Sequence, residues 1–210
     1  MKETKLIMGM PVTIEIVDDV HPGVLNLSFE YFKYVDEKFS TYKKNSEISL
    51  INQGKINKKD YSADMQEIFS LAEKTTVDTY GFFDIKRFDN SYDPSGIVKG
   101  WSVHNVANLL KKHNCKNFYV EAGGDIETFG VNNEGKLWKI GIRNPFKKED
   151  IVKVLEIKDK GVATSGTYIR GAHIYNPKDK NDKLEELASI TVISQNEYEA
   201  ERYAKAAFAM

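Results

Sequence analysis

The order of the hydrophobic patterns along the chain constrains the fold more than any other feature of the sequence. Apolar residues recur at helical spacing over residues 22–39 and 62–79, and a third such pattern follows Gly100. The alanine-rich stretch 196–210 predicts a closing helix. Helices therefore account for most of the first half of the chain and for its end.

Strands dominate the part of the chain between the third helix and the last one. Short runs rich in β-forming residues are separated there by clusters of Gly, Asn, Asp and Lys: NFYVEA, DIETFGV, KLWKIGI, IVKVLEI, GVATS and SITVIS. A further strand is predicted over residues 5–17, with Gly9 as a bulge or a point of close approach. Because helices and strands do not alternate regularly, the sequence favours an α+β fold with an antiparallel or mixed sheet and packed helices.

Length and composition indicate one domain over residues 1–210. A chain of this size buries a full core without disulfides, and no linker or repeat divides it. The helical pattern runs up to Met210, which leaves open whether further residues complete the domain. The single Cys115 excludes an internal disulfide and a thiolate metal site, and we expect it to be a small core residue.

The charge balance excludes partners that bind through an overall electrostatic field. The chain has 30 Lys and Arg against 31 Asp and Glu, for a net charge of -1, so we expect no nucleic acid partner. The N-terminus lacks the pattern of a secretory signal, and no segment approaches the roughly 20 apolar residues of a membrane span. These features favour a cytoplasmic protein with no direct membrane insertion.

The stretch DPSGIVKGW, from Asp93 to Trp101, places turn-forming residues and one lysine directly before a helical pattern. A turn that leads into a helix N-terminus directs backbone N–H groups and the positive end of the helix dipole toward an anion. A phosphate-bearing ligand is therefore one interpretation. An ordinary turn between a strand and a helix is the other, because a lone Gly-x-x-Lys-Gly is a weak pattern.

Four more stretches combine small and polar residues: FSTYKKNSEISLIN (39–52), YGFFD (80–84), EAGGDI (121–126) and VATSGTYIRGAHIYNP (162–177). Each also has a structural interpretation. Ser46 and Glu47 can cap a short helix that ends at Asn52, and the glycine pairs and the TSG sequence can form turns. Zinc-ligand spacing, a nucleophile elbow, a GKS or GKT phosphate loop and paired cysteines are all missing from the sequence, which removes those classes of enzyme.

Among the histidines, His173 is the candidate for chemistry. It lies in GAHIYNP, where Gly171 and Pro177 bracket a short β-like segment that would hold the imidazole in a defined direction. Such a residue can orient a phosphate or act as a base, and a structural role is the alternative. His104 is expected on the exposed side of its helix.

Taken in order, these stretches resemble the ApbE family, the FAD:protein FMN transferases. The likeness spans essentially the whole chain and rests on seven motifs in sequence: Met8-Gly9-Met10; Phe39, Ser40, Tyr42, Ser46, Glu47 and Asn52; Gly81, Phe83 and Asp84; Asp93, Gly96, Lys99 and Gly100; Gly123 to Asp125; Ala163 to Gly166; and His173 to Pro177. This order favours the ligand interpretation of DPSGIVKGW.

The resemblance implies a specific reaction. Family members use FAD as a substrate, transfer its FMN half to a Thr or Ser hydroxyl of an acceptor flavoprotein and release AMP, with Mg²⁺ on the diphosphate. Carried over by position, His173 would orient or deprotonate the hydroxyl, and the carbonyl of Gly96 and the carboxylate of Glu201 would bind the metal. The FAD-binding residues would be Met8, Tyr42, Phe82, Phe83, Asp84, Asp93, Lys99 and Ile174.

The last helix departs from the family pattern, in which an Asp and a Thr stand four residues apart. Glu201 and Lys205 occupy these positions here. Glutamate keeps an oxygen ligand, but an ammonium repels a metal ion. The sequence leaves open whether the metal site is weakened or whether the lysine, paired with Glu201, replaces the cation. His104 and Met10 also replace a usual acid and a usual Thr. A non-catalytic FAD-binding module and an FAD pyrophosphatase therefore remain alternatives.

Overall fold

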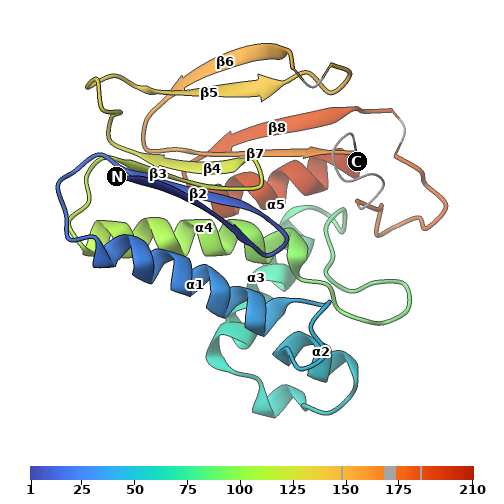
Figure 1. The fold of residues 1–210 in the computed structure, drawn as a ribbon. Coiled ribbons are helices and arrows are strands. Elements are labelled where there is room, and N and C mark those ends of the chain that lie inside the picture. Colours follow the sequence, from blue (N-terminus) through green and yellow to red (C-terminus); the bar gives the residue numbers. More distant parts are fainter. Residues whose placement is uncertain (148, 168–173, 185) are drawn as a thin grey trace.

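The fold is that of a computed structural model, which describes residues 1–147, 149–167, 174–184 and 186–210. In this part of the chain six strands form an antiparallel sheet in the order β1-β2-β3-β4-β7-β8. Its strands are β1 (Lys2–Ile7), β2 (Met10–Ile16), β3 (Phe118–Ala122), β4 (Asp125–Phe129), β7 (Gly161–Gly166) and β8 (Ser189–Ser194). A separate hairpin joins β5 (Trp138–Arg143) and β6 (Ile151–Ile157) (Figure 1).

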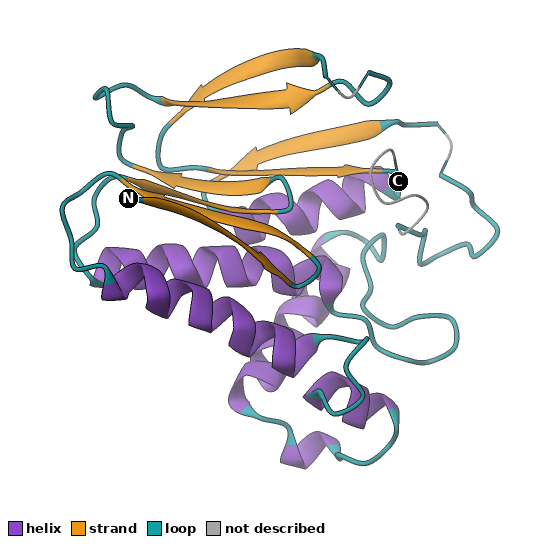
Figure 2. Cartoon of the chain, viewed as in Figure 1, coloured by secondary structure: helices purple, strands orange, loops and turns teal. Residues whose placement is uncertain are grey.

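Helices cover one side of the large sheet (Figures 1 and 2). They are α1 (Gly23–Phe39), α2 (Glu47–Asn52), α3 (Ala63–Asp78), α4 (Ser95–Lys112) and α5 (Glu197–Phe208), with a 3₁₀ turn at Lys58–Asp60. The helix α1 lies beside α4, and α5 packs against α4, β7 and β8. The predicted α+β class and the predicted helices over 22–39, 62–79 and 196–210 are confirmed.

Two of the helices begin at serine caps, and Ser46 is one that the sequence predicts. The Ser46 hydroxyl accepts a hydrogen bond from Ser49 N at 3.1 Å at the start of α2. The Ser62 hydroxyl accepts one from Met65 N at 3.3 Å at the start of α3. Each bond satisfies an N–H group that would otherwise lack a partner in the first turn.

The N-terminal strand predicted over residues 5–17 is in fact a hairpin. Met8 and Gly9 both have positive φ angles, of 56° and 70°, and they connect the paired residues Ile7 and Met10. Two consecutive residues with positive φ form the kind of turn whose twist matches that of antiparallel strands. Gly9 is therefore a turn residue and not a bulge.

The helix α4 begins at Ser95, six residues before Trp101, where the pattern that follows Gly100 predicted its start. Pro94 stands at the cap, and the Asp93 carboxylate accepts a hydrogen bond from Ser95 N at 3.0 Å. Gly96 and Gly100 consequently lie inside the helix, although glycine disfavours a helix interior by roughly 1 kcal/mol relative to alanine. Close contacts with α5, described below, explain why these two positions lack side chains.

The core has two parts, which meet beside the turn between β1 and β2. The first lies between the sheet and the facing sides of α1 and α4 and contains Val12, Ile14, Ile16, Phe29, Phe32, Val103, Val106 and Phe118. The second lies among α2, α3 and the first turns of α4 and contains Ile48, Met65, Ile68, Ile97 and Trp101. Met8 packs against both parts.

No helix within the described ranges is long and apolar enough to cross a membrane.

Candidate functional site

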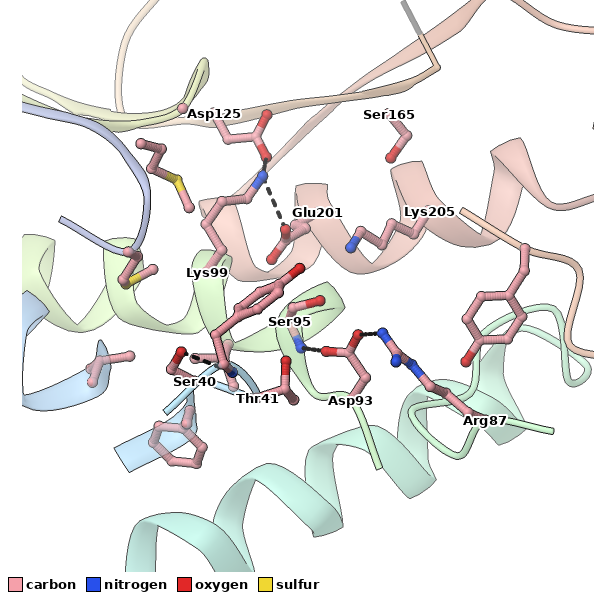
Figure 3. Close-up of a pocket in the computed structure, with 18 of the residues that line it drawn as sticks. Ser40, Thr41, Arg87, Asp93, Ser95, Lys99, Asp125, Ser165, Glu201 and Lys205 are labelled. Atoms are coloured by element: carbon pink, nitrogen blue, oxygen red, sulfur yellow. Dashed lines mark hydrogen bonds and ion pairs between the residues drawn. The ribbon is translucent and has the colours of Figure 1, made fainter. Parts of the chain in front are cut away.

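A cavity of about 790 Å³ opens where the β1–β2 turn, the end of α1, the start of α4 and the end of α5 meet (Figure 3). This volume lies in the range of small-molecule sites. Both polar and apolar groups line the cavity: Met8, Met10, Phe39, Ser40, Thr41, Tyr42, Arg87, Asp93, Ser95, Lys99, Asp125, Thr164, Ser165, Tyr175, Glu201 and Lys205 are among them.

The structure brings the residues singled out in the sequence to two adjacent hollows. Met8, Tyr42, Asp93, Lys99 and Glu201 line the large cavity. A smaller hollow of about 50 Å³ is lined by the remaining described candidates, which are Phe82, Phe83, Asp84, Gly96 and Ile174. Four residues line both hollows: Asp93, Ser95, Tyr175 and Lys205. The predicted catalytic residue His173 lies outside the described residues.

Asp93 organises the start of α4. Its Oδ1 accepts the hydrogen bond from Ser95 N, and its Oδ2 forms an ion pair with Arg87 (Figure 3). Its backbone N–H donates to the carbonyl of Ile85 at 2.7 Å. The carboxylate is thus already bonded on both oxygens, and it links Arg87 to the start of α4 at the cavity wall.

Lys99 is held by two carboxylates at the bottom of the site. Its ammonium forms ion pairs with Asp125 and, at 3.1 Å, with Glu201 Oε1 (Figure 3). The side chains of the two acids are only 4% and 2% exposed. Burial by itself would lower the pKa of Lys99, but Asp125, Glu201 and Glu197 hold it above its ordinary value, so the lysine is charged.

Glu201 also bonds to the backbone of α4. Its Oε2 accepts a hydrogen bond from Gly100 N at 2.7 Å. In a regular α-helix this N–H would donate to the carbonyl of Gly96. Glu201 is therefore tied to α4 through one oxygen and to Lys99 through the other.

Glu197 lies one turn before Glu201 on α5 and is fully buried. A Cβ atom on Gly100 would lie 2.1 Å from its Oε2, so a side chain at position 100 would require this buried carboxyl group to move. In the described part of the chain neither carboxyl oxygen has a hydrogen-bond partner. Burial first, and the neighbouring Glu201 and Asp125 next, raise the pKa of Glu197 well above its ordinary value, which favours the neutral acid.

Lys205 lies one turn beyond Glu201 and points into the cavity from α5 (Figure 3). A Cβ atom on Gly96 would lie 3.0 Å from its Nζ, so the ammonium lies against the first turn of α4. Burial lowers the pKa of Lys205, although Glu201 acts in the opposite direction. Across the described residues it forms no ion pair, and the anticipated partner Glu201 is paired with Lys99 instead.

The sequence predicted His104 on the exposed side of its helix, and this prediction is wrong. Its Nδ1 lies 3.0 Å from Glu127 Oε2, and its side chain is 27% exposed. Glu127 is a buried residue of β4 that also accepts a hydrogen bond from Glu197 N at 3.0 Å. Because β4 and α5 both pack against α4 here, this face of the helix is covered.

Sequence reasoning assigned no role to several residues of the cavity wall. Arg87 lies in a segment without a recognisable pattern, so nothing marked it. Asp125 belongs to the Gly-Gly-Asp motif and could have been found from it, since it binds Lys99 and accepts a hydrogen bond from Thr164 N at 3.0 Å. The Tyr175 hydroxyl donates to the carbonyl of Asp84 at 2.9 Å, and burial raises its pKa to about 12.

The described acids of this site are not arranged as a metal site. The described residues contain no group of three or more His, Cys, Asp or Glu side chains arranged to hold a metal. The oxygens of Asp125 and Glu201 already face Lys99 and backbone N–H groups. The cavity wall also presents the cations Arg87, Lys99 and Lys205 around the start of a helix. Arg87 and Lys99 are paired with carboxylates, and Lys205 has no ion-pair partner among the described residues.

The profile of the ApbE family matches residues 8–89 and 86–210, and the chain belongs to the ApbE family. An FAD:protein FMN transferase of Haemophilus influenzae is 29% identical over 270 residues, which covers 92% of this chain and 77% of that relative. One of Vibrio cholerae is 33% identical over 113 residues, covering 50% of this chain and 34% of the relative.

Solved structures show the same fold. The ApbE protein of Thermotoga maritima superposes with a TM-score of 0.89 at 20% identity, and the flavin transferase ApbE of Vibrio cholerae with a TM-score of 0.85 at 22% identity. Each similarity covers 100% of this chain and 86% of the other. The sheet order and helix packing described above are therefore those of the family fold.

Proposed function

We propose that this protein is an FAD:protein FMN transferase. It transfers the FMN half of FAD to a Thr or Ser hydroxyl of an acceptor flavoprotein and releases AMP. One observation carries the proposal: motifs that lie far apart in the sequence line one cavity, in a chain of the ApbE family. The relative of Haemophilus influenzae named above bears this activity in its name.

The reaction needs charge neutralisation and alignment more than covalent help from the protein. The acceptor oxygen forms a bond to the phosphorus on the riboflavin side of the diphosphate. The bond from this phosphorus to the bridging oxygen breaks, and AMP leaves with that oxygen. The hydroxyl proton passes to a base or to solvent, and His173 is our proposed group for receiving it or for orienting the hydroxyl.

The cavity-lining residues divide into two proposed roles. Lys99, paired with Asp125 and Glu201, would lie beside the flavin nucleotide, while Asp93 would keep Arg87 and the start of α4 in position. The apolar and aromatic walls would contact the rest of FAD: Met8, Tyr42, Phe82, Phe83 and Ile174, together with Asp84. Gly96 would let the ligand approach the backbone.

The Mg²⁺ suggested by the resemblance does not fit the groups present. Glu201, its proposed carboxylate ligand, bonds to Lys99 and to Gly100 N. Lys205 lies beside Gly96, its proposed carbonyl ligand. Mg²⁺ requires oxygen ligands in near-octahedral geometry, and an ammonium at this place repels it. A cytoplasmic site of action remains a prediction from the sequence.

The test is an incubation of the purified protein with FAD and an acceptor protein carrying the Thr or Ser target, in Mg²⁺ and in EDTA. Released AMP is measured by chromatography, and covalently bound flavin by its fluorescence on a denaturing gel. AMP that appears only with the acceptor, together with a fluorescent acceptor band, supports transfer. An acceptor whose target hydroxyl is replaced by alanine serves as the control.

Two other outcomes would contradict the proposal. AMP release without the acceptor would identify an FAD pyrophosphatase, in which water replaces the hydroxyl. Retention of FAD with no AMP under either metal condition would identify a binding module without transfer activity.

A further inference from the structure

We propose that the Lys205 ammonium binds the diphosphate of FAD directly, in the place of a divalent metal ion, so that this protein binds FAD without Mg²⁺. This inference rests on the proposed function. It identifies the side chain whose charge contacts the diphosphate of FAD.

Lys99 and Lys205 differ in their ion-pair partners. Lys99 is neutralised by Asp125 and Glu201. Lys205, in contrast, has no carboxylate oxygen within 4.0 Å among the residues that the structure describes, although it lines the same cavity. A charged group removed from bulk water without a partner is unfavourable. An anionic ligand in the cavity would supply that partner.

The position of Lys205 strengthens the requirement for an anion. Its Nζ and Cδ both lie 3.0 Å from where a Cβ of Gly96 would be, in the first turn of α4. The first turn of a helix carries a partial positive charge, which favours anions and disfavours cations. An ammonium at this end of α4 is therefore unfavourable in the free protein, and a phosphate that contacts the ammonium would make it favourable.

Lys205 also stands at the junction of the two hollows. It lines the large cavity and the smaller one beside Phe82 and Phe83. A ligand that occupies both hollows places its middle against the residues that line both. The middle of a dinucleotide is its diphosphate, which carries two negative charges.

Glu201 and Asp125 already have partners. Glu201 accepts a hydrogen bond from Gly100 N and forms an ion pair with Lys99, while Asp125 pairs with Lys99 and accepts a hydrogen bond from Thr164 N. A divalent ion entering here would have to break these contacts and would face two ammonium groups. Lys205 supplies positive charge at this place without that rearrangement.

The inference is tested by measuring FAD affinity through flavin fluorescence, with EDTA and with Mg²⁺. We expect the wild-type affinity to be the same within twofold in both. Lys205→Met removes the charge and keeps the length of the side chain, and we expect it to weaken FAD binding at least tenfold in EDTA. Lys205→Arg should retain most of the affinity.

A second variant and a control show whether weaker FAD binding comes from the loss of the charge or from unfolding of the variant. Lys205→Thr removes the ammonium and adds an oxygen ligand, so we expect its FAD affinity to increase when Mg²⁺ is added. Lys33→Met removes one positive charge from an exposed position on α1, and we expect wild-type affinity. Circular dichroism shows whether each variant is folded. The comparison of FAD affinity in EDTA and in Mg²⁺ uses the wild-type protein alone, so it does not depend on the folding of any variant.

The outcomes distinguish this inference from the proposed function. Wild-type protein that binds FAD with Mg²⁺ and loses it in EDTA overturns the role of Lys205 while leaving FMN transfer intact. Wild-type affinity in a folded Lys205→Met variant does the same. Failure of the wild-type protein to bind FAD in either condition overturns the proposed function and this inference together.

Discussion

At the scale of single residues, the absence of a side chain at Gly100 leaves space for two carboxyl groups of α5. The carboxyl groups of Glu197 and Glu201 both reach the space that a Cβ would fill, at 2.1 Å and 3.0 Å. The same position gives α4 a residue of poor helix propensity. At this position the close packing of α4 against α5 is accompanied by a residue that lowers the local stability of the helix.

Gly100→Ala tests which of these two effects is larger. Helix propensity alone would stabilise the variant by about 1 kcal/mol. The clash with Glu197 should outweigh this gain and give a net loss of about 1–3 kcal/mol in the free energy of unfolding, measured by urea denaturation.

The control is a double-mutant cycle with Glu197→Ala. Removing the carboxyl group should relieve the clash, so the double variant should be more stable than the sum of the single effects by at least about 1 kcal/mol. Additive losses would show that the two residues do not interact.

At the scale of elements, Asp18 connects β2 to the segment before β3. Its Oδ2 accepts hydrogen bonds from Lys116 N and Asn117 N, both at 2.7 Å, and its Oδ1 accepts one from Asn117 Nδ2 at 3.0 Å. Burial would raise the pKa of Asp18, but the hydrogen bonds from Asn117 and Lys116 hold it below its ordinary value. The charged form is therefore the one that the folded state favours.

Asp18→Asn should lower the free energy of unfolding at pH 7 by roughly 1–3 kcal/mol. A depressed pKa in the folded state contributes stability above the unfolded pKa, and this stability is lost as the pH falls through the folded pKa. The difference between wild type and variant should hence shrink as the pH falls below about 4.

Urea denaturation at pH 7 and pH 3 measures this difference. Asp19→Asn, at the exposed neighbouring residue, is the matched control and should change stability little. A gap between wild type and Asp18→Asn that is the same at both pH values would rule out the carboxylate as its source.

Among the elements, the sequence predicted the helices far better than the limits of the N-terminal strand. Helices α1 and α3 have long apolar stripes and clear starts, so periodicity finds them. The turn at Met8 and Gly9 went undetected because its first residue is a methionine with positive φ, which no propensity favours. The early start of α4 was missed because two glycines suggested a loop, and their reason lies in the distant helix α5.

At the scale of the whole molecule, the packing of α5 on β7 completes the site. Gly161 is a point of close approach, because its Cβ would lie 2.1–2.3 Å from backbone atoms of Asn196 and Glu197. Backbone cannot rotate away as a side chain can. Any larger residue at position 161 must therefore separate the strand from the helix that carries Glu201 and Lys205.

Gly161→Ala is expected to destabilise the protein by about 3 kcal/mol or more. Gly141→Ala is the matched control, since Gly141 also lies in a strand but its nearest neighbour is the side-chain tip of Ile151 at 3.0 Å. It should cost less than about 1 kcal/mol. Thermal and urea unfolding of both variants measure the contrast, and equal losses would argue against a backbone clash.

The sequence by itself determined the α+β class, the main helices and the order of the ApbE motifs, because periodicity and short motifs are local properties of the chain. It also identified ten described candidate residues that line the two hollows. Only the tertiary structure decided the pairing of the charges. Glu201 and Lys205 are one turn apart on α5, yet Glu201 pairs with Lys99 of α4 and Lys205 faces the cavity. Charges act through space, and the distances among three segments far apart in the chain exist only once α4, α5 and β4 have packed together.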